Sequence, residues 1–125
     1  MARILVIDDE KAIGDLVSRV LSRKGHVVTT AVSGEEGLSL FSRQTFDLLL
    51  VDKNLGGMHG GEVISKIRLL RPGFPSILMT AAPEPFALPP ERLDGYLTKP
   101  FKSLKAVEEV VNQALESVAV VAQRR

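Results

Sequence analysis

Cysteine and tryptophan are absent from this chain, and aromatic residues make up only 5% of it. The absence of cysteine excludes disulfide bonds, thiolate nucleophiles and cysteine-ligated metal centres. An excess of one charge is also lacking, because 16 lysines and arginines nearly balance 15 aspartates and glutamates. That balance argues against the strongly basic surface that is typical of a nucleic-acid-binding domain.

Long apolar runs are missing as well. No run approaches the ~20 residues that a membrane-spanning helix needs. The first three residues lead straight into a short apolar stretch and lack the layout of a signal peptide. We therefore expect a cytoplasmic protein that does not insert into a membrane, and a domain that does not contact nucleic acid.

What the chain does contain is an alternation of two hydrophobic patterns along its 125 residues. Short continuous runs of valine, isoleucine and leucine predict strands covered on both faces, and apolar residues at helical spacing predict amphipathic helices. The expected strands are 4–7, 27–31, 48–51, 76–79 and 95–98, and the expected helices lie within 13–21, 33–41 and 63–70 and after residue 103. This order predicts a single domain, 1–125, of the α/β class with a doubly wound parallel sheet.

Two residues mark the start of the second expected helix. Ser33 and Glu36 have the spacing of a capping box, in which each side chain bonds to the backbone near the other residue. Gly37 follows inside the same helix, where glycine costs about 1 kcal/mol relative to alanine.

The segment between the fourth and fifth expected strands contains four prolines, Pro83, Pro85, Pro89 and Pro90. A proline inside a helix costs about 3 kcal/mol. We therefore predict that an irregular connection, with at most a short turn from Pro89, replaces or shortens a regular helix over 81–94.

Polar residues follow four of the expected strands. Asp8 and Asp9 come after the first, Asp52 after the third, Thr80 after the fourth and Lys99 after the fifth. The carboxyl ends of parallel strands share one edge, and the crevice outside that edge is where open α/β sheets bind ligands. We therefore expect these side chains to lie together.

Three carboxylates crowded at one edge repel each other, by ~4 kcal/mol for two charges ~4 Å apart at an effective dielectric constant of about 20. A divalent cation with oxygen ligands relieves this repulsion, and Mg²⁺ is the usual ion where a phosphate shares the coordination. A carboxylate nucleophile, a metal, an ammonium and a hydroxyl together suit phosphoryl transfer. A carboxylate can carry the phosphoryl group as an aspartyl phosphate.

The segments that carry these residues resemble the receiver domain of two-component response regulators, of the chemotaxis-regulator type. They are 4–10, 46–52, 80–81 and 96–101, in the order and spacing typical of the family, and the resemblance covers essentially the whole chain. It implies a flavodoxin-like fold with five parallel strands in the order 2-1-3-4-5.

The resemblance implies a role for each acidic residue. Asp52 is then the phosphoacceptor and also a ligand of Mg²⁺. Asp9 binds the metal directly, Asp8 orients its water ligands, and the backbone carbonyl of Asn54 completes the protein's share of the coordination.

The resemblance also implies a switch. Lys99 pairs with the phosphoryl oxygens, and Thr80 donates its hydroxyl to them and draws its loop inward. Tyr96 turns inward when Thr80 moves. The peptide bond between Lys99 and Pro100 is typically cis in this family.

The function implied is that of a signalling switch rather than an enzyme, with catalysis limited to the domain's own phosphorylation and dephosphorylation. A histidine kinase or phosphotransfer protein donates the phosphoryl group, and an output protein or downstream domain reads the result. One alternative is a phosphorylation-independent interaction module of the same fold, and another is a phosphohydrolase. The sequence leaves open whether the chain is a stand-alone protein or a fragment, and whether it forms a homodimer.

The same residues also have interpretations in which they serve only the structure. Acids suit a helix N-terminus, a threonine can simply end a strand, a lysine can be solvated, and Tyr96 can be ordinary packing. Gly56 stands where family members often have proline, which predicts a looser loop. The apolar stretch 118–122 fits extra packing or a frayed end, or else a dimer contact or a junction with a further domain. We expect His26 and His59 to be exposed and without a functional role.

Overall fold

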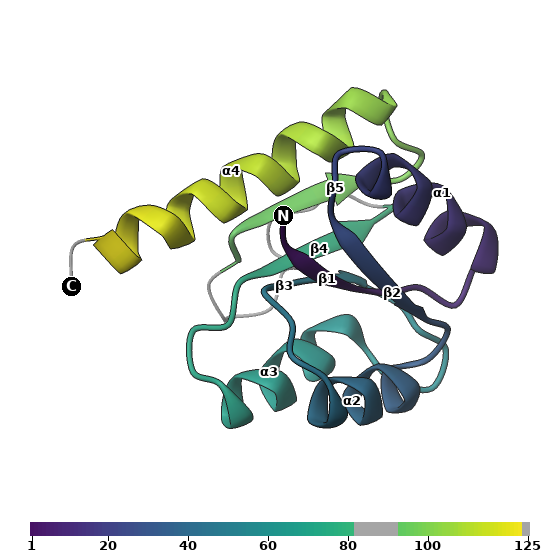
Figure 1. Ribbon diagram of the computed structural model, residues 1–125. Coiled ribbons are helices and arrows are strands. Elements are labelled where there is room, and N and C mark those ends of the chain that lie inside the picture. Colours follow the sequence, from purple (N-terminus) through teal and green to yellow (C-terminus); the bar gives the residue numbers. More distant parts are fainter. Residues whose placement is uncertain (82–92, 124–125) are drawn as a thin grey trace.

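The computed structural model describes the backbone of residues 1–81 and 93–123. Within these residues, helices follow the first, second, third and fifth of five strands (Figure 1). The elements are β1 (Arg3–Ile7), α1 (Lys11–Ser22), β2 (Val27–Ala31), α2 (Gly34–Arg43), β3 (Leu48–Asp52), α3 (Gly60–Leu70), β4 (Ser76–Thr80), β5 (Gly95–Thr98) and α4 (Leu104–Gln123).

All pairings between the strands are parallel, and the sheet has the order β2-β1-β3-β4-β5. The expected α/β class, the doubly wound parallel sheet and the strand order are therefore confirmed. The register aligns the strand ends, with Ile7 opposite Val51, Asp52 opposite Met79 and Thr80 opposite Thr98. This alignment brings the residues at the carboxyl ends of four strands to one edge.

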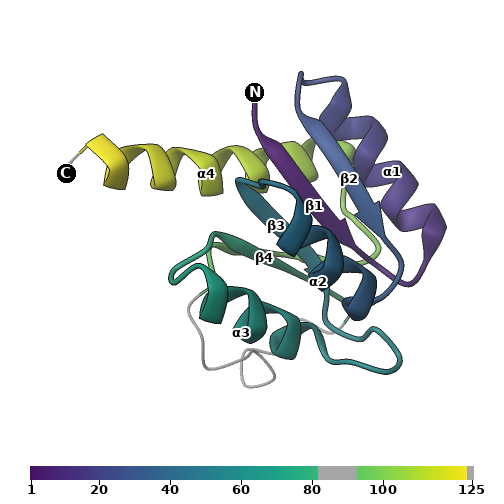
Figure 2. The ribbon, with the colours of Figure 1, turned by 60° about the horizontal axis from the view of Figure 1, so that its bottom comes forward.

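The sheet lies between two layers of helices, with α1 and α4 on one face and α2 and α3 on the other (Figures 1 and 2). Alternate residues of the central strands enter different cores. Ile4 and Val6 belong to the core under α1 and α4, and Leu5 and Ile7 belong to the core under α2 and α3. Because both faces are covered, every residue of β3 is buried, which explains its unbroken apolar run.

The capping box at the start of α2 is present. The Ser33 hydroxyl oxygen accepts a hydrogen bond of 3.1 Å from the Glu36 backbone N–H. The Glu36 carboxylate accepts one of 2.9 Å from the Val32 N–H. Free N–H groups at the helix start are thereby satisfied, and α2 begins after Ser33 as the sequence predicts.

The last helix, α4, has 20 residues and runs past the edge of the sheet (Figures 1 and 2). Its first half carries the expected buried stripe, Val107, Val111 and Ala114. The side chains from residue 118 onward lie outside the described residues, and the alternatives for the stretch 118–122 depend on them. Residues 82–92 also lie outside the described residues, and they make up most of the segment for which an irregular connection is predicted. Among the described residues, no helix is both long and apolar enough to span a bilayer.

Candidate functional site

Four polar residues meet at the carboxyl edge of the sheet. Asp8 follows β1, Asp52 ends β3, Thr80 ends β4 and Lys99 follows β5. Three of them are buried: Asp8 is 1% exposed, Asp52 8% and Thr80 2%. Burial to this degree is unusual for an aspartate. The burial arises because each residue continues a fully covered strand into the edge, where the neighbouring strand ends enclose it.

The Lys99 ammonium lies at the centre of this cluster. Its Nζ is 2.9 Å from Asp8 Oδ2, 3.1 Å from Glu10 Oε1 and 3.5 Å from Asp52 Oδ1. The structure therefore brings Asp8, Asp52 and Lys99 together. One ammonium shares its charge among several carboxylates, so the cluster carries an excess of negative charge that a cation can offset.

Asp8 uses both of its carboxylate oxygens. Oδ2 accepts the hydrogen bond from Lys99, and Oδ1 accepts one of 2.9 Å from the Glu10 backbone N–H. Buried charges in proteins need this kind of full pairing. Asp8 thus fixes both the lysine and the start of the chain segment that leads into α1.

The pKa values of two groups reflect this crowding. Burial and repulsion from Asp8 raise the pKa of the Asp52 carboxyl above its usual value, Asp9 adds to the repulsion, and Lys99 partly offsets both. For Lys99, burial lowers the pKa, but hydrogen bonds to Asp8 and Glu10 and attraction from Asp52 outweigh it and raise the pKa overall. Asp52 is thus an ionisable group whose negative charge is poorly stabilised by the protein alone.

The acidic edge also fits a hard divalent cation. Asp8, Asp9 and Glu10 each offer a carboxylate oxygen, and these oxygens lie within 4.8 Å of one another. Oxygen ligands of this kind suit Mg²⁺. Asp9 is exposed, in contrast to Asp8, so a cation can reach it from the solvent.

Asn54 lies in the loop between β3 and α3, where it forms an antiparallel bridge with His59. Inside that bridge the Leu55 N–H donates to the Met58 carbonyl, at 3.1 Å, and Gly56 adopts a positive φ of 70° at the tip. The loop is therefore a closed hairpin that holds the Asn54 backbone just beyond the end of β3.

The two residues expected to act as a switch differ in exposure. Thr80 is 2% exposed, whereas Tyr96 is 50% exposed. The Lys99 N–H donates a hydrogen bond of 2.8 Å to the Thr80 carbonyl, which ties the end of β5 to the end of β4. The peptide bond between Lys99 and Pro100 is cis.

Two features of the site were not found from the sequence. Glu10 follows Asp8 and Asp9 in the sequence, but its contact with Lys99 joins segments distant in the sequence and has no local signal. Gly60 at the start of α3 packs against the backbone of Asp52 and Lys53 and donates a hydrogen bond of 2.7 Å to the Lys53 carbonyl. The sequence signal for Gly60 is that it belongs to a segment rich in glycine, which also contains Gly56, Gly57 and Gly61.

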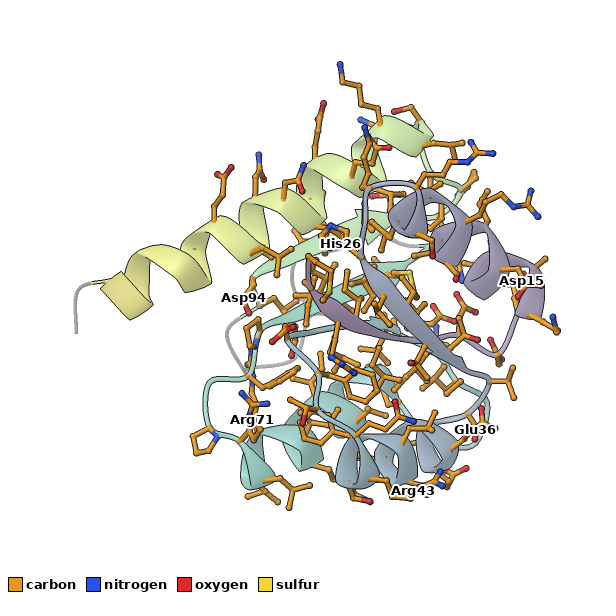
Figure 3. The ribbon with its side chains drawn as sticks, viewed as in Figure 1. Asp15, His26, Glu36, Arg43, Arg71 and Asp94 are labelled. Atoms are coloured by element: carbon orange, nitrogen blue, oxygen red, sulfur yellow. The ribbon has the colours of Figure 1, made fainter. Side chains whose placement is uncertain are left out.

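A second polar cluster lies at the opposite end of the sheet and has a structural role. Asp94 Oδ2 accepts a hydrogen bond of 2.8 Å from the Ser76 N–H and lies 3.5 Å from the Arg68 guanidinium. Arg68 also donates to the Phe74 carbonyl. Figure 3 shows Asp94 and Arg71 on the side of the sheet away from Asp15 and Glu36, which lie near the carboxyl edge. This cluster fastens the start of β5 to β4 and α3.

Comparison with known proteins connects this geometry to a family. Residues 4–112 match the model of the response regulator receiver domain. The chain is 32% identical to the transcriptional regulatory protein GlrR of Escherichia coli strain K12 over 127 residues, which cover 99% of this chain and 28% of GlrR. It is 39% identical over 102 residues to the alkaline phosphatase synthesis transcriptional regulatory protein PhoP of Bacillus subtilis, covering 79% of this chain and 42% of PhoP. The chain thus spans less than half of either relative.

Solved structures of response regulators are also similar to this chain. The chemotaxis response regulator CheY4 of Vibrio cholerae is similar with a TM-score of 0.81 and 26% identity, covering 91% of this chain and 98% of that one. The response regulator protein TrrA of Thermotoga maritima, solved in complex with Mg(2+)-BeF, is similar with a TM-score of 0.75 and 33% identity, covering 90% and 99%.

Proposed function

This chain belongs to the family of response regulator receiver domains, and we propose that it acts as a phosphoacceptor switch of a two-component system. In this proposal, Asp52 accepts a phosphoryl group from a phosphohistidine of a histidine kinase or phosphotransfer protein in the cytoplasm. The observation that carries the proposal is the position of Asp52, a buried carboxylate that lies 3.5 Å from the Lys99 ammonium beside further acidic ligands.

The reaction is a displacement at phosphorus. An Asp52 carboxylate oxygen forms the new O–P bond while the P–N bond of the donor breaks, and the bonding electron pair stays on the imidazole nitrogen. The product is an acyl phosphate on Asp52. In this proposal Lys99, whose Nζ lies 3.5 Å from Asp52, donates hydrogen bonds to the phosphoryl oxygens, and the hydroxyl of Thr80, the last residue of the adjacent strand β4, donates another.

Asp8, Asp9, Asp52 and the Asn54 carbonyl would hold the Mg²⁺ ion. The ion supplies positive charge that offsets the repulsion between the carboxylates and the incoming phosphoryl group. The clustering of the carboxylate oxygens of Asp8 and Asp9 supports this assignment. The raised pKa of Asp52 supports it as well, because it reflects negative charge that the protein leaves partly uncompensated.

Phosphorylation would then shift a two-state equilibrium. Thr80 moves toward the phosphoryl group, Tyr96 exchanges its half-exposed position for an inward one, and a partner protein or a further domain binds the altered surface. GlrR and PhoP, the relatives of this chain, are named as transcriptional regulatory proteins, so we propose that the output concerns transcription.

Intact mass measurement tests the proposal. We expect the protein to gain the mass of one phosphoryl group after incubation with acetyl phosphate and Mg²⁺, and to lose this gain when EDTA is present. Asp52→Asn removes the gain, while Asp15→Asn, which alters an exposed aspartate of α1, retains it. Labelling that persists in Asp52→Asn would refute the assignment of the acceptor. No labelling of the wild type would favour an interaction module, and turnover of phosphate esters would favour a phosphohydrolase.

A further inference from the structure

We propose that Glu10 is a positioning residue that competes with the phosphoryl group for Lys99 and so favours the unphosphorylated state. The inference rests on the proposed function, since it concerns how readily Asp52 holds a phosphoryl group. It assigns to Glu10 a role opposite to that of the neighbouring acids, which favour phosphorylation by holding the metal ion.

The geometry is a closed ring of three hydrogen bonds. Lys99 Nζ donates to Asp8 Oδ2 at 2.9 Å and to Glu10 Oε1 at 3.1 Å, and the Glu10 N–H donates to Asp8 Oδ1 at 2.9 Å. Asp8 therefore fixes the Glu10 backbone at the point from which its side chain reaches Lys99. The contact between Glu10 and Lys99 is therefore supported by a backbone hydrogen bond of Glu10 and not by the two long side chains alone.

The ammonium has only three N–H donors to distribute. Two of them are directed to Asp8 and Glu10, while Asp52 lies farther away, at 3.5 Å. A phosphoryl group on Asp52 adds oxygens that need donors from the same ammonium. The third N–H can meet one of these oxygens, and any further hydrogen bond to the phosphoryl group requires Asp8 or Glu10 to give up part of its hydrogen bonding to Lys99.

Burial decides which partner yields. The Asp8 side chain is 0% exposed, so an unpaired carboxylate there has no water to replace the lysine. The Glu10 side chain is 64% exposed and is hydrated again at little cost when it leaves Lys99. We infer that Glu10 releases Lys99 on phosphorylation, and that its hold on Lys99 opposes the binding of the incoming anion.

The test compares Glu10→Gln with Glu109→Gln, which removes an exposed carboxylate from α4 and controls for net charge. The measurements are the affinity for fluoroberyllate at saturating Mg²⁺, the rate of labelling by acetyl phosphate, and Mg²⁺ affinity by calorimetry. We expect Glu10→Gln to raise the first two about threefold, in keeping with the modest strength of an exposed ion pair. Glu109→Gln should match the wild type.

A double-mutant cycle separates action through Lys99 from a general effect. In a Lys99→Met background, Glu10→Gln should no longer raise fluoroberyllate affinity, since the two residues no longer compete. The same gain in both backgrounds overturns the inference, as does a Glu10→Gln variant that equals the wild type. Weaker Mg²⁺ binding by Glu10→Gln also overturns it and makes Glu10 a metal ligand. Failure of the wild type to be labelled counts instead against the proposed function.

Discussion

Gly60, the first residue of α3, lies directly against the backbone carbonyl of Asp52. A Cβ atom on Gly60 would overlap that carbonyl oxygen and would lie 3.0 Å from both the Asp52 carbonyl carbon and the Lys53 Cα. The first turn of α3 can pack on the end of β3 only because this position has no side chain. The place of the candidate phosphoacceptor is thus determined partly by a residue outside its own strand.

We expect Gly60→Ala to displace the Asp52–Lys53 peptide and to slow labelling by acetyl phosphate at least about tenfold, because small misplacements of a nucleophile are costly. Overpacking should also lower the free energy of unfolding, by ~1–3 kcal/mol. Gly57→Ala is the matched control, since a Cβ there meets nothing within 4 Å. Equal labelling rates for the two variants would contradict the prediction.

Lys99 compensates a carboxylate that has no exposure to solvent. Replacing it by methionine keeps most of the volume but leaves Asp8 and its neighbours without their cation. We expect Lys99→Met to lower the free energy of unfolding by ~2–4 kcal/mol, measured by urea denaturation. Adding Asp8→Asn should recover part of the loss. Lys102→Met, at an exposed position, should stay within about 0.5 kcal/mol of the wild type.

The fold was predictable because its signals are local. Short apolar runs such as 48–51 favour strands covered on both faces, and Ser33 with Glu36 marks a helix start without reference to the rest of the chain. The convergence of Asp8, Asp52 and Lys99 followed from the rule that parallel strands share a carboxyl edge. For these features the sequence pattern and the packing lead to the same structure.

Contacts between segments that are distant in the sequence could not be predicted. Gly37 was expected only to weaken α2, yet it makes room for Ile7, whose side chain occupies the space of a Cβ. His26 was expected to be exposed but is partly buried, and its Nδ1 accepts a hydrogen bond from the Ala2 N–H. Neither contact produces a periodic pattern in the sequence, because each depends on the position that a helix or loop takes against the sheet.

The contact between Gly37 and Ile7 predicts a substitution effect that changes sign with its background. In the wild type, Gly37→Ala gains about 1 kcal/mol of helix propensity but forces its Cβ into the Ile7 side chain, at a cost of ~1–3 kcal/mol. We expect a net loss of unfolding free energy. In an Ile7→Ala background the overlap disappears, so the same substitution should stabilise. Identical effects in both backgrounds, by urea denaturation, would refute the steric account.

His26 predicts how stability depends on pH. Burial and the positive charge of the N-terminus lower the pKa of His26 in the folded state, and its Nδ1 must stay unprotonated to accept the Ala2 N–H. Below the unfolded-state pKa of about 6.5, the unfolded chain therefore binds more protons at this position than the folded one. The free energy of unfolding should decrease as the pH falls from about 7.5 to 5.5, and thermal melts across that range measure the slope. His26→Asn, which retains an acceptor but does not titrate, should flatten the slope, whereas His59→Asn should preserve the part that His26 contributes. An unchanged slope in His26→Asn would assign the pH dependence to other groups.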